Sequence, residues 1–148
     1  MVMQQIADGL GVAGVLAIAA LGLGIVFGVM KIINMAHGEL IMIGAYTTYM
    51  VCTVGHLSYY AGMVASFLVA AAVGLLMERF ILRRLYGRPL ETLLATFGLS
   101  IFLQQFIRLV FGPDGKSVSS PFQGTWMIGD VAIPLFRLFI VIVAIVMI

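Results

Sequence analysis

The chain has 148 residues, of which 63% are hydrophobic and only 9% are charged, and its net charge is +2. A soluble domain carries about 25% charged residues, and a chain of this length could not hide so much apolar surface from water, so we expect lipid to be its solvent. The few, scattered positive charges argue against nucleic acid as a partner. The single cysteine, Cys52, excludes an internal disulfide.

The first apolar segment covers residues 9–30 and contains no charged side chain. It exceeds the ~20 residues that a transmembrane helix needs. It lacks a basic region before Lys31, so we expect it to be retained rather than cleaved as a signal peptide. Small residues recur at every fourth position, which predicts a ridge for close helix packing, although membrane helices are rich in glycine in general. This first ridge consists of Ala20, Gly24 and Gly28.

A polar break follows at residues 31–39, where Asn34, His37 and Glu39 interrupt two apolar segments. One interpretation is a short surface loop, with Glu39 near the start of the next helix, where the helix dipole favours an anion. The other interpretation is a break inside the membrane, where these side chains offer donors and acceptors to a small polar solute. In that second case the first two segments form one broken crossing and the N-terminus is cytoplasmic.

Residues 40–77 contain no Asp, Glu, Lys or Arg. At ~1.5 Å per residue, a single helix of that length would be nearly twice as long as a bilayer is thick. The sequence therefore predicts two spans, residues 40–54 and 59–84, separated by the turn-like cluster at residues 55–58. A second ridge of small residues on the latter span consists of Gly62, Ser66, Ala70 and Gly74.

The segment 78–91 carries half of the basic residues of the chain and is punctuated by Gly87 and Pro89. Basic loops stay on the cytoplasmic side of a membrane, so we expect this loop to be cytoplasmic. Alternating spans then place the N-terminus and the segment 112–130 on the extracytoplasmic side. The basic residues of the loop are Arg79, Arg83, Arg84 and Arg88.

The fourth predicted span, residues 90–111, carries a polar stripe at intervals of four residues: Thr92, Thr96, Ser100 and Gln104. Ser and Thr hydroxyls can bond back to carbonyls of their own helix, but that would leave Gln104 unexplained. The stripe therefore predicts either a lining of the solute path or a contact between helices.

The segment 112–130 is polar, rich in Gly, Pro and Ser, and holds the only tryptophan, Trp126. It is predicted to be an external loop with Trp126 at the membrane interface. A fifth span, residues 133–148, is still apolar where the sequence stops, so we expect the natural chain to continue. Together these segments predict an all-α polytopic membrane protein with about five transmembrane helices, one of which is either intact or broken near residues 31–39.

The residues offer no catalytic or metal-binding constellation and no nucleotide phosphate loop. His37 and Glu39 diverge on a helix because they are two residues apart. We therefore predict a transport protein rather than an enzyme, with no cofactor and no metal. The predicted substrate path consists of Asn34, His37, Glu39, Thr47, Thr96, Ser100 and Gln104.

Two stretches resemble the LivH-type permeases of ATP-binding-cassette importers, which carry branched-chain amino acids or urea. They are GLGIVFGVMKIINMAHGELIMIGAYTTYMV and ERFILRRLYGRPLETLLATFGLSIFLQQFIRLVFG. The forms RPLETLLATFGLS, AALGLGIVFGVM and GAYTTY are most similar to the urea-transporter permease subunit. The resemblance implies an inner-membrane protein with a second permease subunit, ATPase subunits that hydrolyse ATP, and an extracytoplasmic solute-binding protein.

The first hypothesis is therefore an importer subunit that moves urea or short amides by alternating access. Urea is neutral, and the spans offer uncharged hydrogen-bonding groups. The alternative is a branched-chain amino acid permease, which would need a partner for each of the two charges of its substrate. More remote alternatives are a self-assembling channel for small solutes and a structural scaffold in which the polar stripe is incidental.

Overall fold

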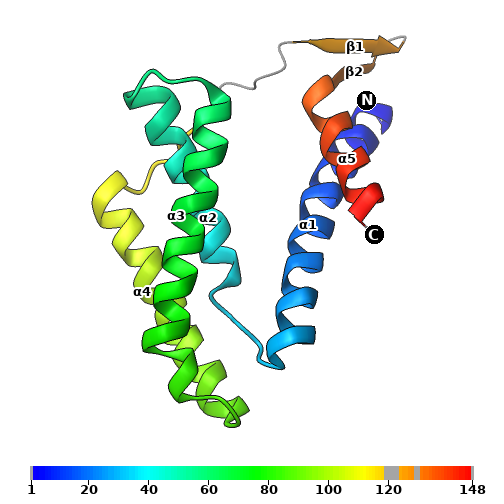
Figure 1. Ribbon diagram of the computed structural model, residues 1–148. Coiled ribbons are helices and arrows are strands. Elements are labelled where there is room, and N and C mark those ends of the chain that lie inside the picture. The colour runs from blue at the N-terminus through cyan, green and yellow to red at the C-terminus, as the bar shows by residue number, and fades with distance from the viewer. Residues whose placement is uncertain (1, 119–123, 129–130, 148) are drawn as a thin grey trace. The chain divides into compact units, whose positions relative to one another are not determined.

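The structure, a computed structural model, describes residues 2–118, 124–128 and 131–147. The chain divides into two compact units, one formed by residues 1–25 and 119–148 and the other by residues 26–118. The helices (Figure 1) are α1 (Val2–Met30), α2 (His37–Tyr49), α3 (Tyr59–Phe80), α4 (Pro89–Phe111) and α5 (Leu135–Met147). A π-helical segment, Met50–Val54, extends α2, and a short 3-10 turn, Leu82–Arg84, follows α3.

The fold is that of an all-α polytopic membrane protein. Among the described residues, three helical segments are long and apolar enough to cross a membrane: Gln4–Met30, Tyr59–Arg84 and Pro89–Phe111. Helices α2 and α5 are shorter, at 13 residues each. The large apolar side chains on the outside of these helices are exposed, as expected where lipid takes the place of water.

The helices of the second unit end where the sequence predicts breaks. Lys31 follows α1 with a φ of 53°, and His56 follows the π-helical segment with a φ of 50°. Both values lie in the left-handed region, which does not continue a right-handed helix. Helix α3 then begins at Tyr59, where the Ser58 hydroxyl accepts a hydrogen bond from the Ala61 amide at 3.4 Å. Pro89 opens α4, a position at which its missing N–H costs nothing.

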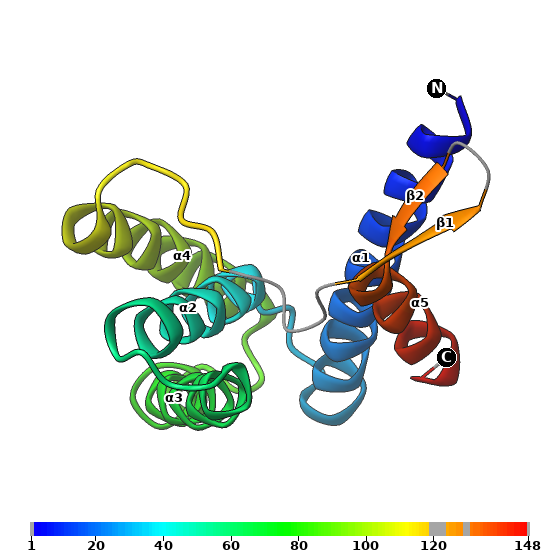
Figure 2. The ribbon, with the colours of Figure 1, turned by 90° about the horizontal axis from the view of Figure 1, so that it is seen from above.

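Helix α2 lies between α3 and α4 (Figure 2). Part of the second ridge makes this close approach to α3 possible, because a Cβ atom on Gly62 would lie 3.0 Å from Cys52 Sγ. A Cβ atom on Gly74, at the other end of the ridge, would have no neighbour within 4 Å.

The first ridge has no such neighbour. A Cβ atom on Gly24 or Gly28 would meet nothing within 4 Å among the described residues, so its packing role stays a prediction. Two other glycines of α1 approach α5 instead: a Cβ atom on Gly11 would lie 3.1 Å from Arg137 Cδ, and one on Gly14 would lie 3.3 Å from Ile140 Cγ2. Neither glycine belongs to the predicted ridge.

The predicted external loop contains a short antiparallel hairpin, which the all-helical expectation missed. Strands β1 (Thr125–Ile128) and β2 (Val131–Pro134) pair so that Trp126 stands opposite Ile133. Two short runs rich in β-branched and aromatic residues, two residues apart, are typical of a hairpin. Helix α5 therefore begins at Leu135 rather than at the predicted residue 133. Residues 119–123 and 129–130 of the predicted loop, and residue 148 of the predicted fifth span, lie outside the described residues.

Candidate functional site

The first part of the polar break is an irregular backbone segment with one face buried. Residues 31–34 are neither helix nor strand and lead through a turn into α2. Ile32, Asn34 and Ala36 are buried, with 4%, 8% and 0% of their surface exposed, whereas the residues between them are exposed. This alternation is the side-chain pattern of an extended chain. The segment is therefore a packed part of the second unit.

Asn34 organises the turn that starts α2. Its side-chain Oδ1 accepts a hydrogen bond from the Ala36 amide at 3.0 Å, and its backbone carbonyl accepts one from the His37 amide at 3.2 Å. Asn side chains stabilise turns in this way because they imitate a backbone carbonyl. The buried Asn34 amide oxygen thus serves the backbone of the break itself.

Thr96 of α4 joins the break to the polar stripe. Its Oγ1 accepts a hydrogen bond from the Met35 amide at 3.2 Å and donates one to the Leu93 carbonyl at 3.1 Å. The side chain is fully buried. A buried amide without such an acceptor would cost ~1–3 kcal/mol, so Thr96 is well placed to hold the extended backbone against α4.

Glu39, in the first turn of α2, meets the next two members of the stripe. Its Oε1 accepts hydrogen bonds from the Ser100 hydroxyl and from Gln104 Nε2, the latter at 2.8 Å. Ser100 Oγ and Gln104 Nε2 also lie 3.3 Å apart. Among the described residues, no cationic side chain forms an ion pair with Glu39. The carboxylate is held by neutral donors alone.

The free energies of these hydrogen bonds are large enough to stabilise an acidic side chain at this position. A hydrogen bond to a charged group contributes ~1.5–3 kcal/mol, and the dipole at the start of α2 adds ~0.3–1 kcal/mol. Placing an acidic side chain at the centre of a membrane helix costs about 3 kcal/mol on insertion scales. Two such hydrogen bonds and the dipole are therefore comparable in size with that cost.

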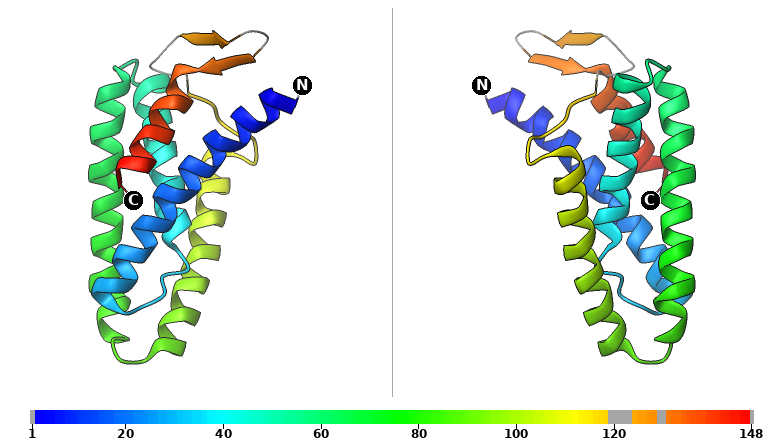
Figure 3. Two further views of the ribbon diagram at one scale, coloured as in Figure 1. Left: turned by 90° about the vertical axis from the view of Figure 1, so that its right-hand side faces the viewer. Right: turned by 90° about the vertical axis from the view of Figure 1, so that its left-hand side faces the viewer.

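Helix α2, which carries Glu39, runs alongside α3 and α4 (Figure 3). Ser100 is equally far from Pro89 and Phe111, the ends of α4. On the other side, Gly44 faces Ser66 and Thr48 faces Gly62 across the α2–α3 contact. Because α2 and α3 run antiparallel, continuing the register of these pairs places the start of α2 beside the centre of α3.

Other predicted path residues do not join this cluster. Thr47 donates its hydroxyl to the Ile43 carbonyl of its own helix at 2.8 Å. His37 is half-buried at the start of α2, and its backbone amide serves the Asn34 turn. Thr92, the first member of the polar stripe, is fully buried but donates to the carbonyls of Leu85 and Arg88, both at 3.0 Å. It therefore fixes the turn between α3 and α4.

That turn carries the predicted cytoplasmic charges. Leu82 is buried beneath it, the Tyr86 hydroxyl donates to Glu78 at 3.0 Å, and Arg88 pairs with Glu91 at 3.1 Å. Partial burial, together with the Glu78 carboxylate, raises the pKa of the Tyr86 phenol above its usual range. The arginines of the predicted loop are all exposed: Arg79, Arg83, Arg84 and Arg88.

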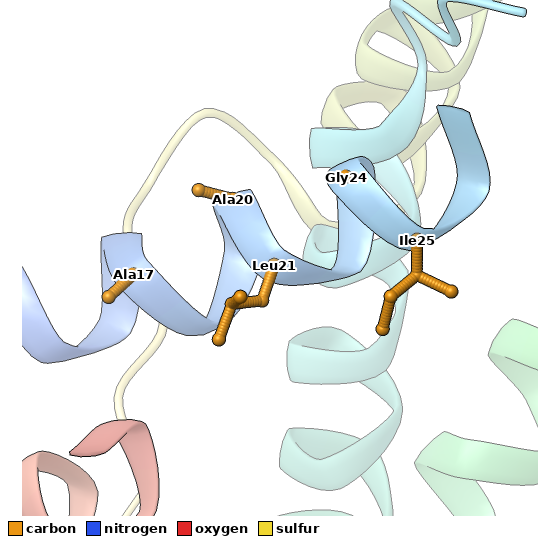
Figure 4. A pocket seen from close by; sticks show the side chains of 5 residues that line it. All are labelled: Ala17, Ala20, Leu21, Gly24 and Ile25. Carbon is orange, nitrogen blue, oxygen red and sulfur yellow. The ribbon is translucent and has the colours of Figure 1, made fainter. Parts of the chain in front are cut away.

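The described residues form a hollow in each of the two units. One, of about 480 Å³, is lined by small and apolar side chains on one helix, α1 (Figure 4). It offers no side-chain donor or acceptor with which to orient a polar solute. The lining residues are Ala17, Ala20, Leu21, Gly24 and Ile25.

The second hollow, of about 240 Å³, lies in the second unit near the end of α4, where the rings of Tyr46 and Phe111 are 4.6 Å apart. It is lined by Ala45, Tyr46, Tyr49, Gly115, Lys116 and Val118. Within the described part of the chain, no group of three or more His, Cys, Asp or Glu side chains could hold a metal ion.

Comparison with known proteins identifies the kind of chain that carries this site. The family described as "Branched-chain amino acid transport system / permease component" matches residues 5–148. The chain is 33% identical, over 136 residues, to the high-affinity branched-chain amino acid transport system permease protein LivH of Escherichia coli. It is also 33% identical, over 137 residues, to the corresponding permease protein BraD of Pseudomonas aeruginosa.

Each of these matches covers 86% of the chain, but only 44% of LivH and 45% of BraD. The chain thus spans less than half the length of these relatives. No solved structure matches the chain.

Proposed function

Because the chain belongs to the family of branched-chain amino acid transport permease components, we propose that it is part of the membrane subunit of an ATP-binding-cassette importer for branched-chain amino acids. The similarity to LivH and BraD over 86% of the chain is the observation that carries this proposal. These relatives favour the amino acid alternative of the sequence analysis over its first hypothesis, urea. They give no support to a urea-specific subunit.

The proposal includes the partners that such an importer requires. A second permease subunit, ATPase subunits and an extracytoplasmic solute-binding protein would complete the transporter in the inner membrane. ATP hydrolysis would take place on the partner subunits, since this sequence contains no nucleotide phosphate loop. The permease would contribute the path and the conformational change.

We further propose that the polar break lies within the membrane. Its contact with Ser100, in the middle of a helix long enough to span, supports this depth. The Met35 amide bonds to Thr96, which lies one helical turn nearer to Pro89 than Ser100 does. The irregular segment therefore runs toward the turn between α3 and α4. Irregular backbone at such a depth is tolerated where it is packed in protein or lines a cavity.

The dimensions fit a segment that enters from the cytoplasmic side. Met35 lies at the level of Thr96, which is about 10 Å from Pro89 along α4, and the four residues before Met35 can cover up to about 13 Å. Lys31 can therefore lie at the same membrane surface as the arginines of the turn between α3 and α4. With α1 crossing the whole membrane, the N-terminus and the segment 112–130 would then be extracytoplasmic, which agrees with the bias of basic residues.

Uptake of labelled substrates tests the proposed function. In a bacterial strain that lacks the gene, the complete protein expressed with its partner subunits should restore uptake of radiolabelled leucine. It should leave urea uptake unchanged, and an ATPase-inactive partner should abolish the leucine signal. Recovery of urea uptake without leucine uptake would contradict the proposal. Leucine entry that persists without ATP hydrolysis would instead indicate a channel.

A further inference from the structure

We infer that the Glu39 carboxylate pairs with the α-ammonium group of the amino acid while it passes through the permease. The inference rests on the proposed function and deepens it, because it assigns one charge of the substrate to one atom of the chain. It is carried by the hydrogen bonds of Glu39, by its missing counter-ion and by its place beside the middle of α4.

The carboxylate has a spare oxygen in a fixed orientation. Ser100 and Gln104 both donate to Oε1. Among the described residues, no hydrogen bond to the other oxygen, Oε2, accompanies them. Glu39 is half-buried, so part of the side chain remains accessible. The two donors from α4 therefore hold the group in one position while Oε2 is left for a further donor.

The charge of Glu39 is also exceptional in its position. The other acidic residues lie in the first two turns of α1, near the loop ends of α3 and α4, or between residues 112 and 130. Among the acidic side chains that the structure describes, Glu39 is the one that bonds to the centre of a helix long enough to span a membrane. The start of α2 places the positive end of a helix dipole near this side chain but supplies no counter-ion. An ionisable group at such a depth usually has a functional partner.

An amino acid supplies that partner and urea does not. The α-ammonium group carries a full positive charge and three N–H donors, and a charge-assisted hydrogen bond to a carboxylate is about twice as strong as a neutral one. Urea offers only neutral amide donors, which gain no ion pair at Glu39. A carboxylate held in this way would thus favour a zwitterionic substrate over a neutral amide.

Ligand binding to the complete permease, purified with its partner subunits in lipid nanodiscs, tests this inference. Tritiated leucine is the probe. Isoamylamine, which keeps the ammonium group but lacks the carboxylate, and isocaproate, which keeps the carboxylate but lacks the ammonium group, are the competitors. The variants are Glu39→Gln, which keeps the shape but removes the charge, and Glu39→Asp, which keeps the charge. Glu91→Gln is the control, since Glu91 is exposed and pairs with Arg88.

In the Glu39→Gln protein, we expect leucine to bind about tenfold more weakly, as the loss of one ion pair predicts. Isoamylamine should compete in the wild-type protein but no longer in Glu39→Gln, whereas competition by isocaproate should be unchanged. Glu39→Asp should recover part of the affinity, and Glu91→Gln should match the wild type. A purely structural role of Glu39 would weaken both competitors together.

The variant Ala36→Cys, in a Cys52→Ala background, provides the structural readout. Ala36 is fully buried, so this cysteine should be equally protected from a maleimide reagent in wild-type and Glu39→Gln proteins. Unchanged leucine affinity and unchanged isoamylamine competition in Glu39→Gln would overturn the inference alone. Absence of leucine binding and uptake in the wild-type protein would overturn the proposed function as well.

Discussion

Two acidic residues in apolar helices, Asp8 and Glu39, are held in opposite ways. In the first unit, Asp8 of α1 pairs with the Arg137 guanidinium of α5 and also accepts a hydrogen bond from Gln4 Nε2 at 3.3 Å. In the second unit, the described partners of Glu39 of α2 are two neutral donors, Ser100 and Gln104. A carboxylate paired with a cationic side chain has its charge balanced within the protein, whereas a carboxylate with neutral donors alone can still bind a cation.

The surroundings of Asp8 and Glu39 also differ, in exposure and in the segments that adjoin them. The side chains of Asp8 and Arg137 are 47% and 41% exposed, and the pair closes a helix contact that passes over Gly11. An ion pair between half-exposed side chains contributes at most about 1 kcal/mol to stability. Its main effect is to join the two helices. Glu39 instead adjoins an irregular segment whose inner face is buried. The first acid therefore has the environment of a structural ion pair, and the second has the environment expected of the substrate-binding group proposed above.

The largest effect should follow when Glu39 loses both donors. In the complete protein, the double variant Ser100→Ala, Gln104→Ala leaves the carboxylate without a hydrogen bond from α4. We expect the free energy of unfolding to fall by about 3 kcal/mol, since hydrogen bonds to charged groups contribute ~1.5–3 kcal/mol each. Titration of the purified protein with sodium dodecyl sulfate in mixed micelles measures this change.

Gln105→Ala is the matched control for that experiment, because Gln105 is exposed on the same helix. It should change the free energy of unfolding by less than about 0.5 kcal/mol. If the double variant were as stable as this control, the hydrogen bonds to Glu39 would not hold the break against α4.

A smaller effect is expected from Thr96→Val, which removes the acceptor of the Met35 amide but keeps the shape of the side chain. The free energy needed to open the segment 31–36 should then fall by about 1–2 kcal/mol, so the segment opens more often. Hydrogen–deuterium exchange of the peptides that cover this segment should show faster exchange of the Met35 amide.

Thr92→Val serves as its comparison, because Thr92 is equally buried but bonds to the turn between α3 and α4. It should accelerate exchange in that turn and leave the segment 31–36 unchanged. Equal acceleration of the segment by both variants would mean that general loosening of α4, rather than the lost acceptor, is the cause.

The smallest effect should come from the ion pair of the first unit. A double-mutant cycle with Asp8→Asn and Arg137→Gln should give a coupling free energy of at most about 1 kcal/mol, because both side chains are half-exposed. Leucine binding should be unaffected by either single variant. A coupling several times larger, or a loss of leucine binding, would erase the distinction between the two acids.

The sequence by itself determined the class of the protein and the positions of its breaks. Apolar segments too long for one crossing, together with polar interruptions, predicted the helix ends near residues 31–39 and 55–58 because composition and local turn chemistry act at short range. The period of four in the stripe of α4 likewise placed Thr96, Ser100 and Gln104 on one helix face. The hairpin at Thr125–Pro134 was missed because loop composition outweighed two very short strand patterns.

Only the tertiary structure decided what the polar face of α4 meets. Glu39 and Ser100 are 61 residues apart in the chain, and helix periodicity defines a face without saying which neighbour covers it. The same limit applies to α1, where Gly11 and Gly14 approach another helix while the more conspicuous Gly24 and Gly28 meet nothing within 4 Å among the described residues. Side-chain spacing is a local property, whereas the pairing of faces depends on the packing of the whole unit.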